Sequence, residues 1–373
     1  MIRSLLIVGA SGRAAMASAV RAGWQPVVLD LFADDDTRAM GPVIPCPMDE
    51  YPQGFVALAE QAPPGPWMYT GGLENYPEVV EAISRGRELF GVGPEVLKRV
   101  RDPFKLSKVV RMPRIDEPPG LSRWVPGAGE PHRGKPGGSL RKPLRGAGGL
   151  GIRFAGELDL PTPEYYFQEF IPGPSYSALF LFPASDSPEL LGVCAQLIGE
   201  WWLHAPPFHY CGNIGPLSTD NGLSAELRRI GEALRPLKLR GLIGVDFMRT
   251  DAGIRVLEVN PRYTASVELY ERALGRSLLS DHIRCFPERG ALPRVENGQP
   301  ARLKIHGKAI LYAAREFVVP ADHPWRGPDF ADIPAVGSAI SAGHPVVTLF
   351  AAADIESECR ERLMALARVS APR

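Results

Sequence analysis

The sequence lacks three features that would place it in a special class of protein. Its five cysteines form no Cys-x-x-Cys pair, which argues against a zinc knuckle or a disulfide framework. No apolar run approaches the ~18–20 residues that a membrane-spanning helix requires. The 42 Lys and Arg balance the 42 Asp and Glu, so no overall field favours nucleic acid or an anionic membrane. These absences predict a cytoplasmic protein that acts on small molecules, with neither nucleic acid nor membrane as a partner.

The charge is nevertheless unevenly distributed along the chain. Between Lys98 and Gly156 there are fourteen Lys and Arg but only four Asp and Glu, and glycine is frequent. A basic, glycine-rich stretch in a neutral protein suits a small polyanion such as a nucleoside triphosphate, although a solvated basic surface has the same composition.

The first 95 residues alternate between strand and helix patterns. Apolar strands are expected at Ser4–Val8, Pro26–Leu29 and Trp67–Thr70, with an Ala-rich helix at Arg13–Ala22. This alternation predicts an open parallel sheet with ligand sites at the strand ends. Further strands are expected at Tyr166–Phe170, Ser177–Phe182, Leu191–Leu197, Leu242–Met248 and Arg255–Val259, with a helix near Ser224–Leu234. Beyond residue 290 we expect short strands and a final helix over Ile355–Val369.

The segment Gly9-Ala-Ser-Gly12, with Asp30 at the end of the next strand, imitates the start of a nicotinamide-binding domain. The usual fingerprint has three glycines spaced Gly-x-Gly-x-x-Gly, and the third is absent here. An NAD(P)-dependent oxidoreductase therefore stays only as an alternative.

The most informative segment is Leu140-Arg-Lys-Pro-Leu-Arg-Gly-Ala-Gly-Gly-Leu-Gly-Ile152. Lys142 leaves a strand, and Gly146, Gly148, Gly149 and Gly151 follow. Such a loop can cradle phosphates through successive backbone N–H groups, while the lysine adds a point charge. Without other support, the segment is also compatible with a flexible hairpin tip.

Two later segments complete a nucleotide and metal site. The strand Tyr166-Phe-Gln-Glu-Phe-Ile-Pro-Gly173 suits an adenine hinge, with backbone at Phe170 and Ile171 against the purine edge. Asp246 precedes Glu258 by 12 residues, which fits two adjacent antiparallel strands, and Glu258 and Asn260 share one face of the second strand. Two carboxylates and an amide oxygen suit Mg²⁺, and burying them without partners would be costly.

Together, in this order, these three elements resemble the ATP-grasp superfamily over about residues 100–290. The combination of Lys-Pro-x-x-Gly-x-Gly-Gly-x-Gly-Ile with Glu-Val-Asn-Pro-Arg, ending at Arg262, is specific. The glycine-rich end of the chain looks like the C-terminal domain of biotin carboxylase-type members. Within the superfamily the chain looks similar to carboligase-like proteins found alongside tetrahydromethanopterin-linked one-carbon enzymes.

The resemblance implies the cofactors ATP and Mg²⁺ (or Mn²⁺) and a role for each matching residue. Arg262 and Lys142 would be catalytic, and Asp246, Glu258 and Asn260 would hold the metal. The nucleotide-binding residues would be Lys105, Lys142, Gly146, Gly148, Gly149, Gly151, Gln168, Glu169, Phe170, Ile171 and Ser175.

Two departures from the family pattern affect the nucleotide site. Asp102-Pro103 stands where many members have Asp-Lys, so Arg101, Lys105 or Lys108 would replace the first phosphate-binding lysine. Ser175 stands near the position where many members have an acid for the ribose.

Candidates for substrate binding come from the loops that follow predicted strands. At the first turn these are Ser11, Gly12 and Arg13, and Arg13 is expected to bind a carboxylate of the substrate. Glu74 lies after a later strand, and Asn213 lies in the Gly/Pro-rich segment Phe208–Pro216. Such positions lie where an open sheet binds its ligands.

The expected fold is α/β plus α+β, in four parts. Residues 1–97 form an open parallel sheet, 98–172 a small lobe with a glycine-rich lid, 173–290 a large lobe with the metal site, and 291–373 a β-rich C-terminal region. The expected activity is an ATP-dependent ligase that converts a small-molecule carboxylate into an acyl phosphate for attack by an amine or a similar nucleophile, in cofactor biosynthesis linked to tetrahydromethanopterin or methanofuran. A non-catalytic nucleotide-binding protein is a second alternative, and a homodimer stays open.

Overall fold

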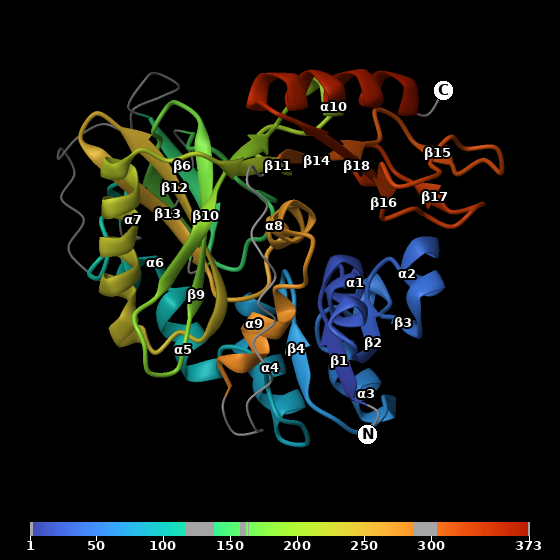
Figure 1. The fold of residues 1–373 in the computed structure, drawn as a ribbon, viewed down its shortest axis with the longest axis horizontal. Coiled ribbons are helices and arrows are strands. Elements are labelled where there is room, and N and C mark those ends of the chain that lie inside the picture. The colour runs from blue at the N-terminus through green and yellow to red at the C-terminus, as the bar shows by residue number, and fades with distance from the viewer. Residues whose placement is uncertain (1–2, 117–137, 157–161, 163, 287–303, 372–373) are drawn as a thin grey trace.

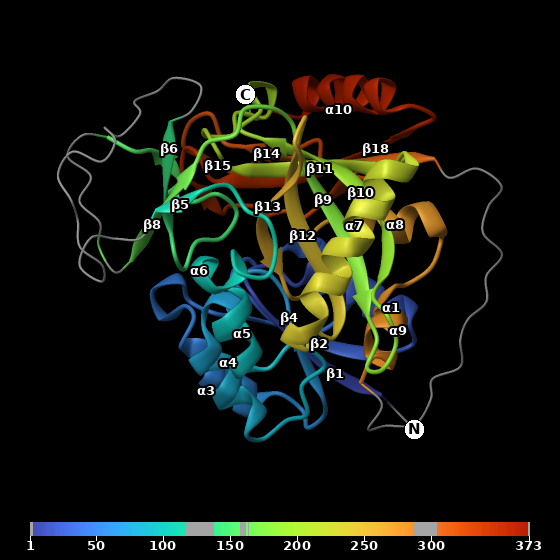
Figure 2. The same ribbon diagram turned by 90° about the vertical axis from the view of Figure 1, so that its left-hand side faces the viewer.

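The structure is a computed structural model, and it describes residues 3–116, 138–156, 162, 164–286 and 304–371. Part of the basic stretch, residues 117–137, therefore lies outside the described residues. The chain folds into an N-terminal parallel sheet, a small antiparallel sheet and a large antiparallel sheet (Figures 1 and 2). This arrangement confirms the predicted α/β plus α+β class.

The N-terminal domain is a four-stranded parallel sheet in the order β3-β2-β1-β4. Its strands are β1 (Ser4–Val8), β2 (Gln25–Asp30), β3 (Val43–Pro45) and β4 (Trp67–Tyr69). Its helices are α1 (Arg13–Arg21), α2 (Asp35–Met40), α3 (Gly54–Gln61) and α4 (Pro77–Ser84), with 3-10 turns η1 (Met48–Glu50) and η2 (Leu73–Asn75). The β1 and β4 side chains are almost fully buried, as the apolar runs predict for strands covered on both faces.

The small lobe follows through two short helices. Helices α5 (Pro94–Val100) and α6 (Pro103–Leu106) lead into an antiparallel sheet in the order β5-β8-β6-β7. Its strands are β5 (Ile115–Asp116), β6 (Ser139–Pro143), β7 (Arg153–Phe154) and β8 (Tyr165–Glu169). The glycine-rich segment is the connection between β6 and β7, as predicted.

The large sheet has eight strands in the order β13-β12-β9-β10-β11-β14-β18-β16. Its strands are β9 (Ser175–Phe182), β10 (Glu189–Ile198), β11 (Tyr210–Leu217), β12 (Gly241–Thr250), β13 (Gly253–Asn260), β14 (Ile305–Tyr312), β16 (Phe330–Ala331) and β18 (Pro345–Ala353). A two-stranded pair, β15 (Phe317–Val318) and β17 (Ala339–Ile340), lies beside its C-terminal end. Three strands from beyond residue 290 thus continue the sheet of the large lobe.

Helices cover both faces of this sheet. Helix α7 (Asn221–Leu234) packs over β9 and β10, and α10 (Glu356–Ser370) packs over β14 and β18 (Figure 1). On the opposite face, α8 (Val267–Leu274) and α9 (Leu279–Arg284) lie between the large sheet and α1. The remaining 3-10 turns are η3 (Trp201–Leu203) and η4 (Arg235–Leu237). No helix of the described residues is long and apolar enough to cross a membrane.

Candidate active site

The expected metal-binding side chains meet on neighbouring strands. Asp246 of β12 lies opposite Glu258 of β13 in the antiparallel register. The Nδ2 of Asn260 lies 3.0 Å from Asp246 Oδ2 and 3.3 Å from Glu258 Oε1. The strand alternation therefore brings all three groups to one point, as the sequence predicted.

The electrostatics of this point favour an added cation. Burial raises the pKa of Asp246, and the neighbouring Glu258 carboxylate raises it further. Burial opposes ionisation of Glu258 as well, but Arg101 and Lys142 lower the pKa of Glu258. Carboxylate and amide oxygens are the donors that Mg²⁺ prefers, so the residues present fit a magnesium ion. Among the described residues, no three His, Cys, Asp or Glu side chains gather at one point. The third donor expected here is the Asn260 amide oxygen, which in the structure accepts from Arg101 Nη1 at 3.4 Å and from Arg262 Nη2 at 3.5 Å.

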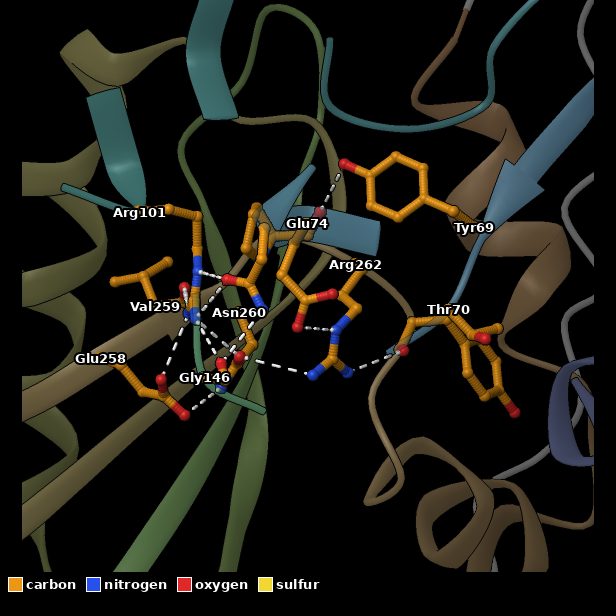
Figure 3. A network of polar contacts seen from close by, with 12 residues as sticks. Tyr69, Thr70, Glu74, Arg101, Gly146, Glu258, Val259, Asn260 and Arg262 are labelled. Atoms are coloured by element: carbon orange, nitrogen blue, oxygen red, sulfur yellow. Dashed lines mark hydrogen bonds and ion pairs between the residues drawn. The ribbon is translucent and has the colours of Figure 1, made fainter. Parts of the chain in front are cut away.

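Arg101 reaches into the same point from the end of α5 (Figure 3). Its Nη1 donates to Glu258 Oε2 at 3.2 Å and to the Val259 carbonyl at 3.1 Å. Its Nη2 donates to Asn75 Oδ1 at 2.9 Å. By contrast, the side chain of Lys105 is 57% exposed and pairs with Asp102 at 3.0 Å, and Lys108 is exposed. Of the three candidates for the first phosphate-binding residue, the structure brings Arg101 into the site.

Lys142 lies on β6 and enters the site from the small lobe. Its Nζ donates to Gln168 Oε1 at 3.0 Å. Gln168 is almost completely buried, and its Nε2 has no hydrogen-bond partner among the described residues. Both Lys142 and Glu258 line a pocket between α5, the glycine-rich loop and β13. Other residues lining this pocket are Arg101, Pro103, Met112, Gly146, Gly148, Gly149, Tyr166 and Leu257.

The glycine-rich loop is closed over this pocket. The Gly146 carbonyl accepts from Asn75 Nδ2 at 3.0 Å, and the Gly148 carbonyl accepts from the Tyr210 N–H at 3.0 Å. Gly149 has a φ of +84°, and a Cβ there would lie 1.9 Å from the Phe208 carbonyl oxygen. Only glycine fits such an approach, so the loop can dock on the large lobe. Gly151 also has a positive φ of +76°.

The expected adenine hinge is only partly free to bind a purine. The Phe170 N–H donates to the Gly138 carbonyl at 2.7 Å, and Glu169 Oε2 accepts from the Arg114 N–H at 3.1 Å. Among the described residues, nothing accepts from the Ile171 N–H, which leaves that donor for a ligand. The Ser175 hydroxyl is hydrogen-bonded to Gln196.

Arg262 is held by an acid from the N-terminal domain. Its Nε donates to Glu74 Oε1 at 2.7 Å, and both side chains are largely buried. The guanidinium lies against Gly71, where the absence of a side chain leaves room for it. Figure 3 shows Glu74, Arg262, Asn260 and Arg101 as one connected network. The second carboxylate oxygen of Glu74 is buried and has no hydrogen-bond partner in the part of the chain that the structure describes.

Sequence reasoning placed Gly71–Asn75 at a ligand-binding end of the sheet, but it missed the pairing of Glu74 with Arg262 and that of Asn75 with Arg101. The side chains of Glu74 and Asn75 both lie in the buried turn η2. Polar residues in a short turn look solvent-exposed in sequence, so only the Gly71-Gly72 pair before them gave a signal of close packing.

The other substrate candidates have partners within the protein. Arg13 is buried, with Nη1 and Nη2 on Glu268 at 2.9 and 2.7 Å and Nε on Asp332 at 2.7 Å. The Ser11 carbonyl accepts from Thr70, and the Gly12 N–H donates to Asp30. Asn213 accepts from the Tyr210 hydroxyl and donates to the Ala195 carbonyl. The structure thus does not bring Ser11, Gly12 and Arg13 into the network around Arg262.

Residues 125–266 match the ATP-grasp domain family. An uncharacterized protein of Methanocaldococcus jannaschii is 26% identical over 225 residues, which cover 58% of this chain and about half, 52%, of that protein.

Two solved structures have the same fold. The biotin carboxylase of Campylobacter jejuni, in complex with a nucleotide, aligns with a TM-score of 0.69 and 15% identity over 99% of this chain and 91% of that one. The L-amino acid ligase of Bacillus licheniformis aligns with a TM-score of 0.69 and 14% identity over 99% of this chain and 97% of that one. Residues 125–266 thus match the ATP-grasp domain family, and the chain has the fold of these two enzymes.

Proposed function

We propose that the protein is an ATP- and Mg²⁺-dependent ligase that activates a carboxylate as an acyl phosphate for attack by an amine. The observation that carries the proposal is a hydrogen-bonded network of Asp246, Glu258, Asn260, Arg101 and Arg262. This network adjoins a pocket that Arg101, Lys142 and Glu258 line. Oxygen donors for a cation therefore adjoin three fixed positive charges, which is the arrangement that phosphoryl transfer requires.

Each part of the site has a task in this reaction. The glycine-rich loop and Lys142 would hold the phosphates, and Ile171 would hold the adenine edge. Asp246, Glu258 and Asn260 would hold Mg²⁺, which supplies neutralisation of the negative charge on the phosphates. Arg101, bonded to Glu258 and Asn75, would supply the charge that the family places on a lysine.

Bond changes follow in two steps. A carboxylate oxygen of the substrate attacks the γ-phosphorus, the bond to the β-phosphate oxygen breaks, and ADP leaves. The amine then attacks the carbonyl carbon, inorganic phosphate leaves, and the amine loses a proton. Arg262, oriented by Glu74, would stabilise the acyl-phosphate oxygens in both steps.

This proposal includes the formation of a C–N bond between two small-molecule substrates. It also includes a place for the reaction in cofactor biosynthesis linked to tetrahydromethanopterin or methanofuran. No contact among the described residues favours the alternative of an NAD(P)-dependent oxidoreductase. The Asp30 carboxylate, which would bind the ribose in that alternative, accepts instead from the N–H groups of Gly12 and Ala33 at 3.3 and 2.7 Å.

Transfer of ¹⁸O tests the chemistry. A screen of acids and amines for ADP release identifies a substrate pair, and the acid is then supplied with labelled carboxylate oxygens. One labelled oxygen should appear in inorganic phosphate for each ADP formed. Arg262→Ala should bind ATP nearly normally and lose this labelling. Label in AMP, or product without labelled phosphate, would overturn the acyl-phosphate route, and ATP binding without turnover would favour a non-catalytic nucleotide-binding protein.

A further inference from the structure

The turn η2 of the N-terminal domain carries two adjacent polar side chains, and each of them holds one arginine of the site. Glu74 binds Arg262, and Asn75 binds Arg101. Glu74 is 1% exposed and Asn75 5%. Asn75 differs from Glu74 because its side chain contacts two separate segments of the chain at once.

Asn75 uses both ends of its amide. Its Oδ1 accepts from Arg101 Nε at 3.1 Å and from Arg101 Nη2 at 2.9 Å, and its Nδ2 donates to the Gly146 carbonyl at 3.0 Å. A guanidinium can only donate hydrogen bonds and a carbonyl can only accept them, so the two partners fix the orientation of the amide. An aspartate at this position could hold Arg101 but could not donate to Gly146.

These contacts join the glycine-rich loop to the proposed metal site. Gly146 is the first glycine of the loop, and its carbonyl oxygen lies 3.5 Å from Arg101 Nη2 (Figure 3). Through Nη1, the same guanidinium donates to Glu258. The path of contacts from the loop to the carboxylate therefore runs through Gly146, Asn75, Arg101 and Glu258.

Another contact ties the loop to the N-terminal domain, but it lies at the surface. Arg145 pairs with Glu78 at 2.9 Å, and their side chains are 60% and 50% exposed. Exposed pairs of this kind contribute little. The Asn75 amide is buried, and a buried polar group that loses its partner is costly. On the side of the N-terminal domain, the closed position of the loop therefore depends more on Asn75 than on Arg145.

Because one amide serves both partners, two movements depend on each other. If the loop moved away, Nδ2 of Asn75 would lose its partner in a buried place, and a rotation of the amide toward another acceptor would release Arg101. Conversely, without Arg101 the Oδ1 loses both of its donors, and the amide is free to turn away from Gly146. Groups that share one hydrogen-bond network in this way are energetically coupled.

We propose that Asn75 is a positioning residue that couples closure of the glycine-rich loop to the placement of Arg101. The loop and the cation that stands in for the first phosphate-binding lysine then take up their positions together. Asn75 acts on the nucleotide through Gly146 and Arg101, without touching it. The effect on the nucleotide rests on the proposed function, whereas the coupling between the loop and the arginine does not.

Hydrogen exchange in the nucleotide-free protein tests the coupling. Exchange is followed by mass spectrometry in the loop segment, residues 144–152, with strand β12 as the internal reference. Asn75→Asp keeps the acceptor for Arg101 and removes the donor to Gly146, and Arg101→Met removes the donors to Asn75. Asn75→Ala removes both contacts without adding a charge. The matched control Asn221→Asp makes the same change at an exposed position of α7, and thermal unfolding verifies that each variant is folded.

Exchange in the loop should be about fivefold faster or more in Asn75→Asp, Asn75→Ala and Arg101→Met than in the wild type and Asn221→Asp. Exchange in β12 should be the same in all of them. Loop exchange at the wild-type rate in the two Asn75 variants or in Arg101→Met would overturn the coupling. Faster exchange that extends equally to β12 would overturn it too, because that result indicates a general loss of stability.

Calorimetric titration with MgATP measures the consequence for the nucleotide. Both Asn75 variants should bind MgATP about tenfold more weakly, or weaker still, than the wild type and Asn221→Asp. Equal affinity would overturn the role of Asn75 toward the nucleotide. Loop exchange that depends on Asn75 and Arg101, in a protein that never releases ADP with any acid and amine, would overturn the ligase and keep the coupling.

Discussion

Glu74 and Arg262 are 188 residues apart in sequence, and their side chains are joined by a 2.7 Å hydrogen bond. The acid belongs to the N-terminal domain and the arginine to the end of β13. The guanidinium that we assign to the acyl phosphate is thus positioned by a domain that holds none of the other expected ATP-binding residues.

Replacing Glu74 by Gln should therefore affect chemistry more than nucleotide binding. Loss of the ion pair frees the Arg262 guanidinium to move, and misplacement of a group by about 1 Å can cost about 100-fold in rate. We expect kcat to fall by about 10- to 100-fold while KM for ATP stays within about twofold. Steady-state kinetics give kcat and KM for ATP. The control is Glu81→Gln, which changes an exposed acid on α4. A rise in KM for ATP with unchanged kcat would contradict a positioning role.

Two of the three basic candidates for the first phosphate position, Arg101 and Lys105, should behave differently. Arg101→Lys shortens a side chain that bridges Glu258 and Asn75, whereas Lys105→Met removes an exposed charge paired with Asp102. Loss of charge-assisted contacts of this kind costs roughly 1.5–3 kcal/mol, so Arg101→Lys should weaken MgATP binding about 10- to 100-fold. Lys105→Met should change it by about fivefold or less, since exposed pairs contribute at most about 1 kcal/mol. Calorimetric titration with MgATP gives both values, and a larger effect at Lys105 would exchange the two roles.

Lys142→Met should weaken MgATP binding while the protein stays folded. Lys142 supplies charge to a loop that otherwise offers backbone, and its one side-chain partner in the structure is Gln168 at 3.0 Å. The expected loss is roughly 1.5–3 kcal/mol of binding energy. Unchanged MgATP affinity, with a thermal unfolding curve that matches the wild type, would remove Lys142 from the site.

Glu258→Gln should abolish turnover more completely than nucleotide binding. The substitution keeps the shape of the side chain but removes the charge that faces the proposed Mg²⁺, whose main effect is on charge that develops during phosphoryl transfer. Turnover of Glu258→Gln is measured as ADP release at increasing magnesium concentration. The control is Glu232→Gln, on the surface of α7. If Glu258→Gln turns over at the wild-type rate at saturating magnesium, the assignment of Glu258 as a magnesium ligand is wrong.

His282 should make stability depend on acidity. Its Nδ1 accepts from the Leu242 N–H and its Nε2 lies 2.9 Å from the Phe90 carbonyl, an arrangement that fits only the neutral ring protonated at Nε2. Burial lowers the pKa of His282 from 6.5 to about 4. Below pH 6.5 the unfolded chain therefore binds a proton that the folded protein excludes, and stability is lost as the pH falls from about 6.5 toward 4.

Urea unfolding at pH 7.5 and pH 5.0 isolates this contribution. The wild type should lose about 2 kcal/mol more between these two values than His282→Asn does. His344→Asn, at an exposed position, should retain the wild-type dependence. An equal loss in His282→Asn and the wild type would show that His282 does not titrate between the two states.

Much of the fold could be predicted because the local signals agree with the tertiary structure. The strand Ser4–Val8 was placed correctly to the residue, and the β12–β13 pair followed from the alternation of Glu258 and Asn260 with apolar neighbours. In these segments burial and periodicity give the same answer.

The rest of the site depends on contacts that no local pattern encodes. Arg101 was one of three equivalent bases in sequence, and only the ending of α5 beside β13 distinguishes it from Lys105. Arg13 looked free to bind a substrate carboxylate, but Glu268 and Asp332 reach it from 255 and 319 residues away. Partners at such separations are set by domain packing, which periodicity does not report.

The continuous large sheet has a consequence for how the chain tolerates truncation. Strand β11, which carries Asn213, is hydrogen-bonded to β10 on one side and to β14 on the other, with Asn213 opposite Lys308. A chain that stopped at residue 290 would keep every residue assigned to ATP but would leave β11 as an open edge of unpaired N–H and C=O groups. Such an edge recruits strands from other molecules. Strands β14 and β18 thus cover the edge that β11 would otherwise expose, and a chain without them is expected to self-associate.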